Sequence, residues 1–138
     1  MGAVDEIKKM LETKSFDPKD LPVFLKAVEE VAASNEDLQD ELEDQDDVVI
    51  MMEVPGMVAA YLEIKDGKLT AADGAHPNPT VTVQMNEEIA TGLLTGEIDT
   101  ASAYMAGDIK IVGEMAKAMA LRSILEIVGE ELGLEMGG

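Results

Sequence analysis

Few side chains in this sequence of 138 residues could form a catalytic or metal site. The chain has no Cys and a single His, His76, which excludes thiolate chemistry, disulfides and His-rich metal centres. Asp73 and His76 share one loop and could act as a general-base pair, although a polar turn beside Pro77 is the commoner origin of such residues. Acidic pairs such as Glu87 and Glu88 are expected by chance among 29 carboxylates. We therefore predict a non-enzyme that holds no cofactor and no metal.

The charge of the chain narrows the classes of partner. The 29 acidic residues against 10 basic ones give a formal charge of −19. Proteins that bind nucleic acids cluster Lys and Arg against the phosphates, so we expect no nucleic-acid partner. The same charge disfavours docking on anionic bilayers. No apolar run has the length of a membrane span and no secretory signal is recognisable, which predicts a cytoplasmic protein without stable membrane insertion.

The acidic residues are densest in residues 36–47. Leu38 and Leu42 keep helical spacing there, and the remaining residues are polar or charged, which predicts a solvated helix and loop. The order of acidic residues in a calcium-binding loop requires a Gly, and this segment has none. A calcium site is therefore disfavoured.

The pattern along the chain predicts an α+β fold with a five-stranded, mostly antiparallel sheet that helices cover on one face. The apolar content of 46% suits a single domain. The turn dipeptides Pro55–Gly56 and Asp66–Gly67 join the first three strands, and we expect the fourth strand to continue this meander with one buried face. The partner of the fifth strand is left open. We expect helices over 3–13, 20–33, 36–47, 86–96, 99–104 and 114–132, and strands over 48–54, 57–65, 68–71, 80–85 and 108–112.

The terminal helix is apolar around more of its circumference than covering a sheet requires. Ten of the fourteen residues in 115–128 are apolar, whereas a stripe about 100° wide is enough for one buried face. The second face must be buried against the core, a second copy of the chain or a ligand. The ten Met residues favour an adaptable interior, although Met also fills a core that has few aromatic side chains.

Residues 95–121 resemble the signature of the sterol carrier protein type 2 family, which reads roughly T-G-K-x-N-P-x-x-A-F-x-x-G-K-L-K-I-x-G-N-M-x-x-A-M-K-L. The resemblance is strong over residues 78–128, moderate back to residue 48 and poor across the N-terminal helices. Matching positions are Thr95, Gly96, Ala103, Gly107, Lys110, Ile111, Gly113, Met115, Ala118, Met119 and Leu121.

The resemblance implies one sterol-carrier-like domain over residues 1–138, with divergent N-terminal helices in 1–47 and the sheet and C-terminal helices in 48–138. It further implies an apolar tunnel between sheet and helices that holds a lipid of the fatty acyl, sterol-like or terpenoid class, and non-enzymatic lipid binding or transfer. The residues that it places near the lipid are Leu94, Ile98, Tyr104, Met105, Ile109, Ile111, Met115, Met119 and Leu125.

Departures from the signature bear on the ligand. Glu97, Ala106, Asp108, Glu114 and Ala120 stand where family members often have basic or amide residues, which removes partners for an anionic head group. We therefore expect a neutral or weakly polar lipid. The alternative function is a protein-interaction or homodimer-forming module that uses the C-terminal helix and has a closed cavity.

Overall fold

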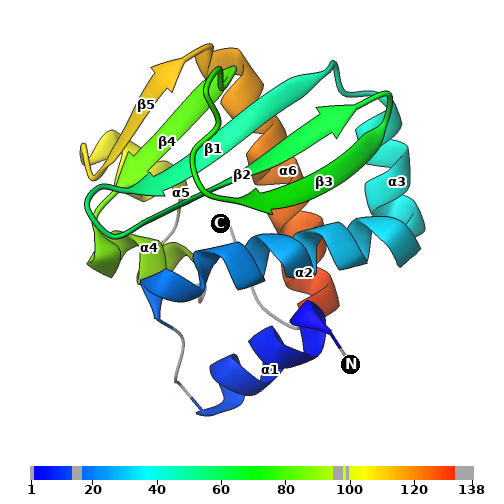
Figure 1. Cartoon of the computed structure of the whole chain (residues 1–138), viewed down its shortest axis with the longest axis horizontal. Coiled ribbons are helices and arrows are strands. Elements are labelled where there is room, and N and C mark those ends of the chain that lie inside the picture. Colours follow the sequence, from blue (N-terminus) through cyan, green and yellow to red (C-terminus); the bar gives the residue numbers. More distant parts are fainter. Residues whose placement is uncertain (1, 14–16, 95–97, 99, 133–138) are drawn as a thin grey trace.

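A computed structural model describes residues 2–13, 17–94, 98 and 100–132. Within these residues a five-stranded sheet carries helices on one face, as the sequence predicts (Figure 1). Helix α2 packs on β2 and β3, and α6 packs on β1, β4 and β5. The elements are α1 (Ala3–Thr13), η1 (Pro18–Asp20), α2 (Leu21–Ser34), α3 (Glu36–Glu43), β1 (Val48–Val54), β2 (Val58–Lys65), β3 (Lys68–Asp73), β4 (Val81–Met85), α4 (Glu87–Leu94), α5 (Thr100–Met105), β5 (Ile109–Gly113) and α6 (Met115–Leu132).

The strand order is β3-β2-β1-β4-β5. The pairs β1–β2, β2–β3 and β4–β5 are antiparallel, whereas β1 and β4 are parallel. The expected meander of four strands is therefore wrong, because β4 does not follow β3 but returns to lie beside β1. A parallel pair cannot be joined by a tight turn, and the connection from β3 to β4 crosses the sheet instead.

The two expected hairpin turns are confirmed. The Met57 N–H donates to the Val54 carbonyl oxygen at 3.0 Å, and Gly56 between them has φ +78°. In the second turn Asp66 and Gly67 have φ of +51° and +77°. Positive φ at both central residues matches the right-handed twist of the flanking strands, which is why Asp–Gly is favoured there.

Both faces of β4 are buried, contrary to the expectation of one buried face. Val81 and Val83 face the helices, yet Thr82 on the opposite face is only 7% exposed. Thr82 lies between Met51 of β1 and Val112 of β5 in the strand register. The connection from β3 crosses this outer face, where the His76 backbone N–H approaches the Met51 sulfur at 3.4 Å. A central strand under such a crossing is covered on both sides.

The first two helices are stacked on the sheet, with α2 on the strands and α1 on α2. Helix α1 packs on α2, and the Glu30 carboxylate accepts hydrogen bonds from the Ala3 and Val4 N–H groups at the start of α1. Asp20 precedes α2 as expected, but its carboxylate accepts from the Asp17 N–H and not from the helix backbone. The N-terminal helices are thus held by side chains far apart in the sequence.

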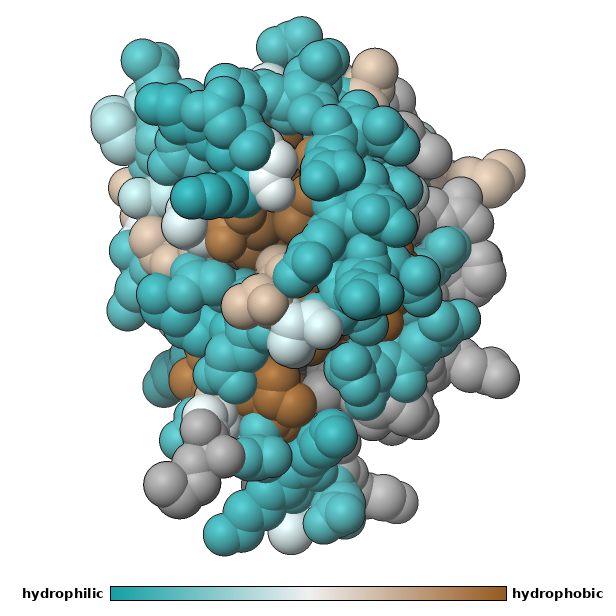
Figure 2. All heavy atoms as spheres, turned by 90° about the vertical axis from the view of Figure 1, so that its right-hand side faces the viewer, coloured by the Kyte–Doolittle hydropathy of each residue, from teal (hydrophilic) through white to brown (hydrophobic). Residues whose placement is uncertain are grey.

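Helix α3 carries the acidic segment as the sequence predicts. Leu38 and Leu42 are fully buried, and Asn35 caps the helix by accepting the Leu38 N–H at 2.9 Å. The acidic residues between the two leucines are exposed or half-buried. Figure 2 shows the side of the molecule on which α3 lies, where hydrophilic residues dominate and hydrophobic ones are visible between them. The segment is a solvated helix that is anchored by two leucines.

Candidate functional site

An apolar layer between the sheet and α6 contains three of the residues that the sequence associates with a lipid. Ile109 and Ile111 of β5 pair with Met85 and Val83 of β4, so their side chains share the face that α6 covers. Ile109 is 5% exposed and Ile111 is partly buried against the core. Leu125 of α6 is also buried in this core. These three residues belong to, or pack against, the apolar core between the sheet and α6.

Ile98 packs against the preceding helix. Its N–H donates to the Gly92 carbonyl oxygen at 2.9 Å, and its side chain occupies the space that a Cβ on Gly92 would need. Ile98 is half-buried and packs on the core. It is therefore part of the apolar wall beneath α4.

The structure does not bring all of the predicted residues to the apolar layer. Tyr104 and Met105 of α5 are 39% and 86% exposed, so both lie at the surface. Leu94 belongs to α4, and Met115 and Met119 belong to α6, but their side chains lie outside the described part of the structure.

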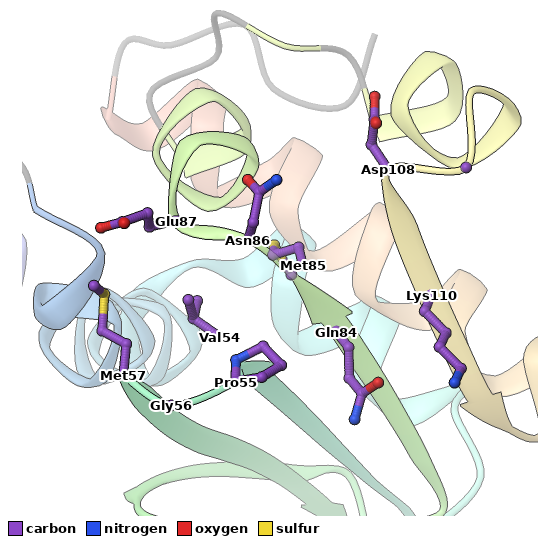
Figure 3. Close-up of a pocket in the computed structure, with 11 residues that line it drawn as sticks. Val54, Pro55, Gly56, Met57, Gln84, Met85, Asn86, Glu87, Asp108 and Lys110 are labelled. Carbon is purple, nitrogen blue, oxygen red and sulfur yellow. The ribbon is translucent and has the colours of Figure 1, made fainter.

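The sequence did not predict an open pocket of about 580 Å³ at one end of the sheet. Strands β1 and β4 run in the same direction and end side by side here, and β5 begins beside them. Figure 3 shows the lining side chains arriving from these strand ends and from the start of α4. The lining residues are Val54, Pro55, Gly56, Met57, Gln84, Met85, Asn86, Glu87, Gly107, Asp108 and Lys110.

The pocket combines an apolar floor with a polar rim. Val54 and Met85 in its wall are 3% and 4% exposed and belong to the core, so the pocket ends against the edge of the apolar core. Its charged lining residues are Glu87, Asp108 and Lys110, which gives two carboxylates against one ammonium group. An uncharged polar group would meet hydrogen-bonding partners on this rim, whereas an anion would meet the excess of negative charge.

The candidate acid–base residue has a structural role. The His76 ring stands edge-on to the Tyr61 ring with centroids 4.9 Å apart, and its Nδ1 accepts a hydrogen bond from the Asn78 N–H at 3.0 Å. Nδ1 is therefore occupied by a hydrogen bond within the turn. In the described ranges no three His, Asp or Glu side chains are grouped so that they could hold a metal ion.

Comparison with known protein families gives one match that covers most of the chain. The model of the SCP-2 sterol transfer family matches residues 25–126, from within α2 to within α6. No curated protein matches the sequence. None of the helices in the described residues is both long and apolar enough to cross a bilayer.

Solved structures share the fold at low sequence identity. Apo sterol carrier protein 2 from Yarrowia lipolytica has a TM-score of 0.61 and 14% identity, over 75% of this chain and 88% of that one. The sterol carrier protein domain 2 of Helicoverpa armigera has a TM-score of 0.57 and 23% identity, over 80% and 87% of the two chains. A UbiJ-SCP2 ubiquinone synthesis protein has a TM-score of 0.58 and 11% identity, over 73% and 88%.

Proposed function

Because this chain belongs to the SCP-2 sterol transfer family, we propose that it binds and transfers a lipid whose apolar part lies between the sheet and the helices. We expect the lipid to be carried unchanged. This function agrees with the fold shared with sterol carrier proteins from other organisms.

The observation that best supports the proposal is that core side chains line the pocket. Met85 lines the pocket and pairs with Ile109 in the register, and both side chains face the apolar layer under α6. A lipid that enters at the shared end of β1 and β4 would lie along this layer. Burial of a sixteen-carbon chain at ~0.8 kcal/mol per methylene yields on the order of 10 kcal/mol before the costs of association are subtracted.

The rim of the pocket favours a neutral or weakly polar head group. Glu87 and Asp108 outweigh Lys110 there, and the whole chain carries a charge of −19. An alcohol, an acylglycerol or a terpenoid avoids the repulsion that a carboxylate or phosphate would meet. Apolar contacts discriminate by only about 1 to 3 kcal/mol per methylene, so we expect selectivity for chain length to be low.

Native mass spectrometry of the purified protein, followed by organic extraction, tests the proposal directly. We expect a stoichiometric apolar species whose extracted head group carries no negative charge. Protein that is isolated empty and also takes up no fluorescent fatty alcohol, sterol or acylglycerol would contradict lipid binding.

Uptake by variants locates the lipid. The family resemblance places Met119 near the lipid, and on that basis Met119→Trp should reduce uptake because the larger side chain would take up space that we assign to the lipid. Thr70→Trp is the matched control, because Thr70 is exposed on β3, away from this layer. Equal uptake by the two variants would contradict the assigned position.

The alternative function, an interaction module that uses the C-terminal helix, has less support. Ile124, Leu125 and Val128 of α6 are all buried inside the fold. Of the α6 side chains that the structure describes, no large apolar one is exposed, so this part of the helix needs no second chain to cover it.

A further inference from the structure

We propose that two copies of this chain pair through the free edges of their β5 strands and form one continuous sheet. The sheet has two edges, and among the residues that the structure describes only the edge at β3 is seen to be protected. At β3 the Glu29 carboxylate accepts the Ala71 N–H at 2.6 Å, and the Lys26 ammonium donates to the Ala71 carbonyl oxygen at 2.8 Å. These side chains of α2 occupy backbone groups that another strand would need.

The backbone of β5 offers equivalent groups at the opposite edge. The Glu114 N–H donates to the Thr80 carbonyl oxygen at 3.3 Å, so Val112 and Lys110, two and four residues back along the strand, also direct their backbone groups toward β4. Ile109, Ile111 and Gly113 must then direct theirs away from the sheet. No residue in the described ranges is seen to bond to them.

The side chains of β5 suit pairing with another strand. Val112 is 47% exposed, which is unusual for a valine in a strand, and it lies on the outer face with Lys110. Helix α5 packs on β5 and adds the exposed Met105 to the same end of the molecule. The acidic helix α3 packs beside β3, and Figure 1 shows it on the opposite side of the molecule from β5. Repulsion between two acidic chains is therefore weakest at β5.

Charge complementarity selects one antiparallel register. When Val112 lies opposite Val112 of the second copy, each Lys110 lies opposite a Glu114, which gives two attractive cross-strand pairs. Centring the pair on Ile111 would place Asp108 opposite Glu114, and centring it on Lys110 would oppose two ammonium groups. Like charges directly opposite destabilise a strand pair. The register centred on Val112 reaches Glu114, one residue past the end of β5, and registers centred on Ile109 or Gly113 would pair still fewer residues of the strand.

The contact between two short strands is small. Stable interfaces commonly bury about 1,200 to 2,000 Å² in total, and one pair of short edge strands contributes less than that. We therefore expect a weak dimer in rapid equilibrium with the monomer. A covalent trap is the appropriate way to detect it.

Cysteine crosslinking tests both the dimer and its register. The chain has no Cys, so Val112→Cys introduces a single thiol. In the proposed register the two 112 positions form a pair without mutual hydrogen bonds, whose Cα atoms are about 4.5 Å apart and within reach of a disulfide. With oxidised glutathione, we expect a disulfide-linked dimer to form at least about tenfold faster than with Lys110→Cys.

Lys110→Cys is the matched control because it lies on the same strand and face and is also exposed. In the proposed register the two 110 positions are offset by four residues, or about 13 Å, which is too far for a disulfide. Equal crosslinking rates in the two variants, or a faster rate in Lys110→Cys, would overturn the proposal.

Sedimentation velocity of charge variants gives a second, independent readout. Lys110→Glu should lower the dimer fraction at a given protein concentration, and Lys110→Glu combined with Glu114→Lys should restore it, because every copy then supplies both exchanged charges. If circular dichroism shows that the double variant is folded but its dimer fraction is not restored, the proposed register is wrong. The result does not depend on whether the chain binds a lipid.

Discussion

The Glu29 carboxylate accepts a hydrogen bond from the Ala71 backbone N–H at 2.6 Å and so attaches α2 to the outer edge of β3. Lys26, one turn earlier, donates to the carbonyl oxygen of the same residue. With both outward groups of Ala71 engaged, the edge of β3 is closed to another strand. β4 pairs with β1 instead, in the middle of the sheet.

Removal of this attachment should destabilise the fold. We expect Glu29→Ala to lower the free energy of unfolding by about 1–2 kcal/mol, because the nearly buried Ala71 N–H loses its acceptor. Glu29→Gln should lose less, since its amide oxygen can still accept. Urea denaturation measures both, with exposed Glu130→Ala as the control. A loss no larger than that of the control would show that water replaces the carboxylate.

The end of β5 requires a glycine. Gly113 has φ +107°, and a Cβ there would lie 2.5 Å from the Thr80 carbonyl oxygen. We expect Gly113→Ala to lower the free energy of unfolding by at least about 2 kcal/mol, because backbone strain adds to a clash with backbone. Gly74 has a similar φ of +95° with no atom within 4 Å, so Gly74→Ala should cost only about 1 kcal/mol. Equal losses in thermal or urea unfolding would contradict the close approach at Thr80.

The rim of the pocket should discriminate between head groups of equal chain length. We expect dodecanol to displace a fluorescent lipid at about tenfold lower concentration than laurate at pH 8, because laurate is then ionised and faces Glu87 and Asp108. The double variant Glu87→Gln with Asp108→Asn should narrow this difference, whereas Glu130→Gln should leave it unchanged. Tighter binding of laurate than of dodecanol by the unmodified protein would contradict the neutral preference.

An exposed ion pair joins α6 to the connection between α3 and β1. The Lys117 ammonium donates to the Asp46 carboxylate at 2.7 Å, and this hydrogen bond holds the pKa of Asp46 below its usual value. The same bond raises the pKa of Lys117. Because its pKa is lowered, Asp46 stabilises the fold at a pH above the ordinary carboxylate pKa, and this stabilisation is lost as the pH falls through the lowered pKa. The stabilisation from Lys117 is lost as the pH rises through its raised pKa.

Asp46→Asn should therefore lower the melting temperature slightly near neutral pH, and the difference from the unmodified protein should shrink as the pH falls below the ordinary carboxylate pKa of about 4 and through the lowered pKa of Asp46. The effect should be small because the pair is exposed, and it should shrink further in 1 M NaCl at a Debye length of about 3 Å. Differential scanning calorimetry across this pH range measures it. A difference that does not shrink as the pH is lowered would mean that Asp46 acts through packing and not through charge.

Local patterns were enough to predict the helices and strands. The hairpin turn at Asp66–Gly67 follows from the left-handed backbone that these residues tolerate, and the cap at Asn86 follows from its side chain, which accepts the Ile89 N–H at 2.9 Å. The family could also be predicted from the sequence, because residues 95–121 carry its signature and the family model matches residues 25–126.

Part of the candidate site could be predicted in the same way. Ile109 and Ile111 alternate with Lys110 along β5, so their shared buried face follows from the two-residue period of a strand. Tyr104 and Met105 were chosen from the family signature, and the sequence does not show which side of the short helix α5 is covered. The structure places both at the surface. Whether they approach a bound lipid stays a prediction.

Only the tertiary structure decided the strand order and what depends on it. Nothing local to residues 74–80 specifies whether β4 pairs with β3 or with β1, because this choice depends on contacts between segments far apart in the chain. The parallel pairing brings the ends of β1 and β4 together and so creates the pocket at Val54 and Met85. It also leaves β5 at an open edge. Residue type and spacing determine local conformation, whereas pockets and free edges arise where separate elements meet.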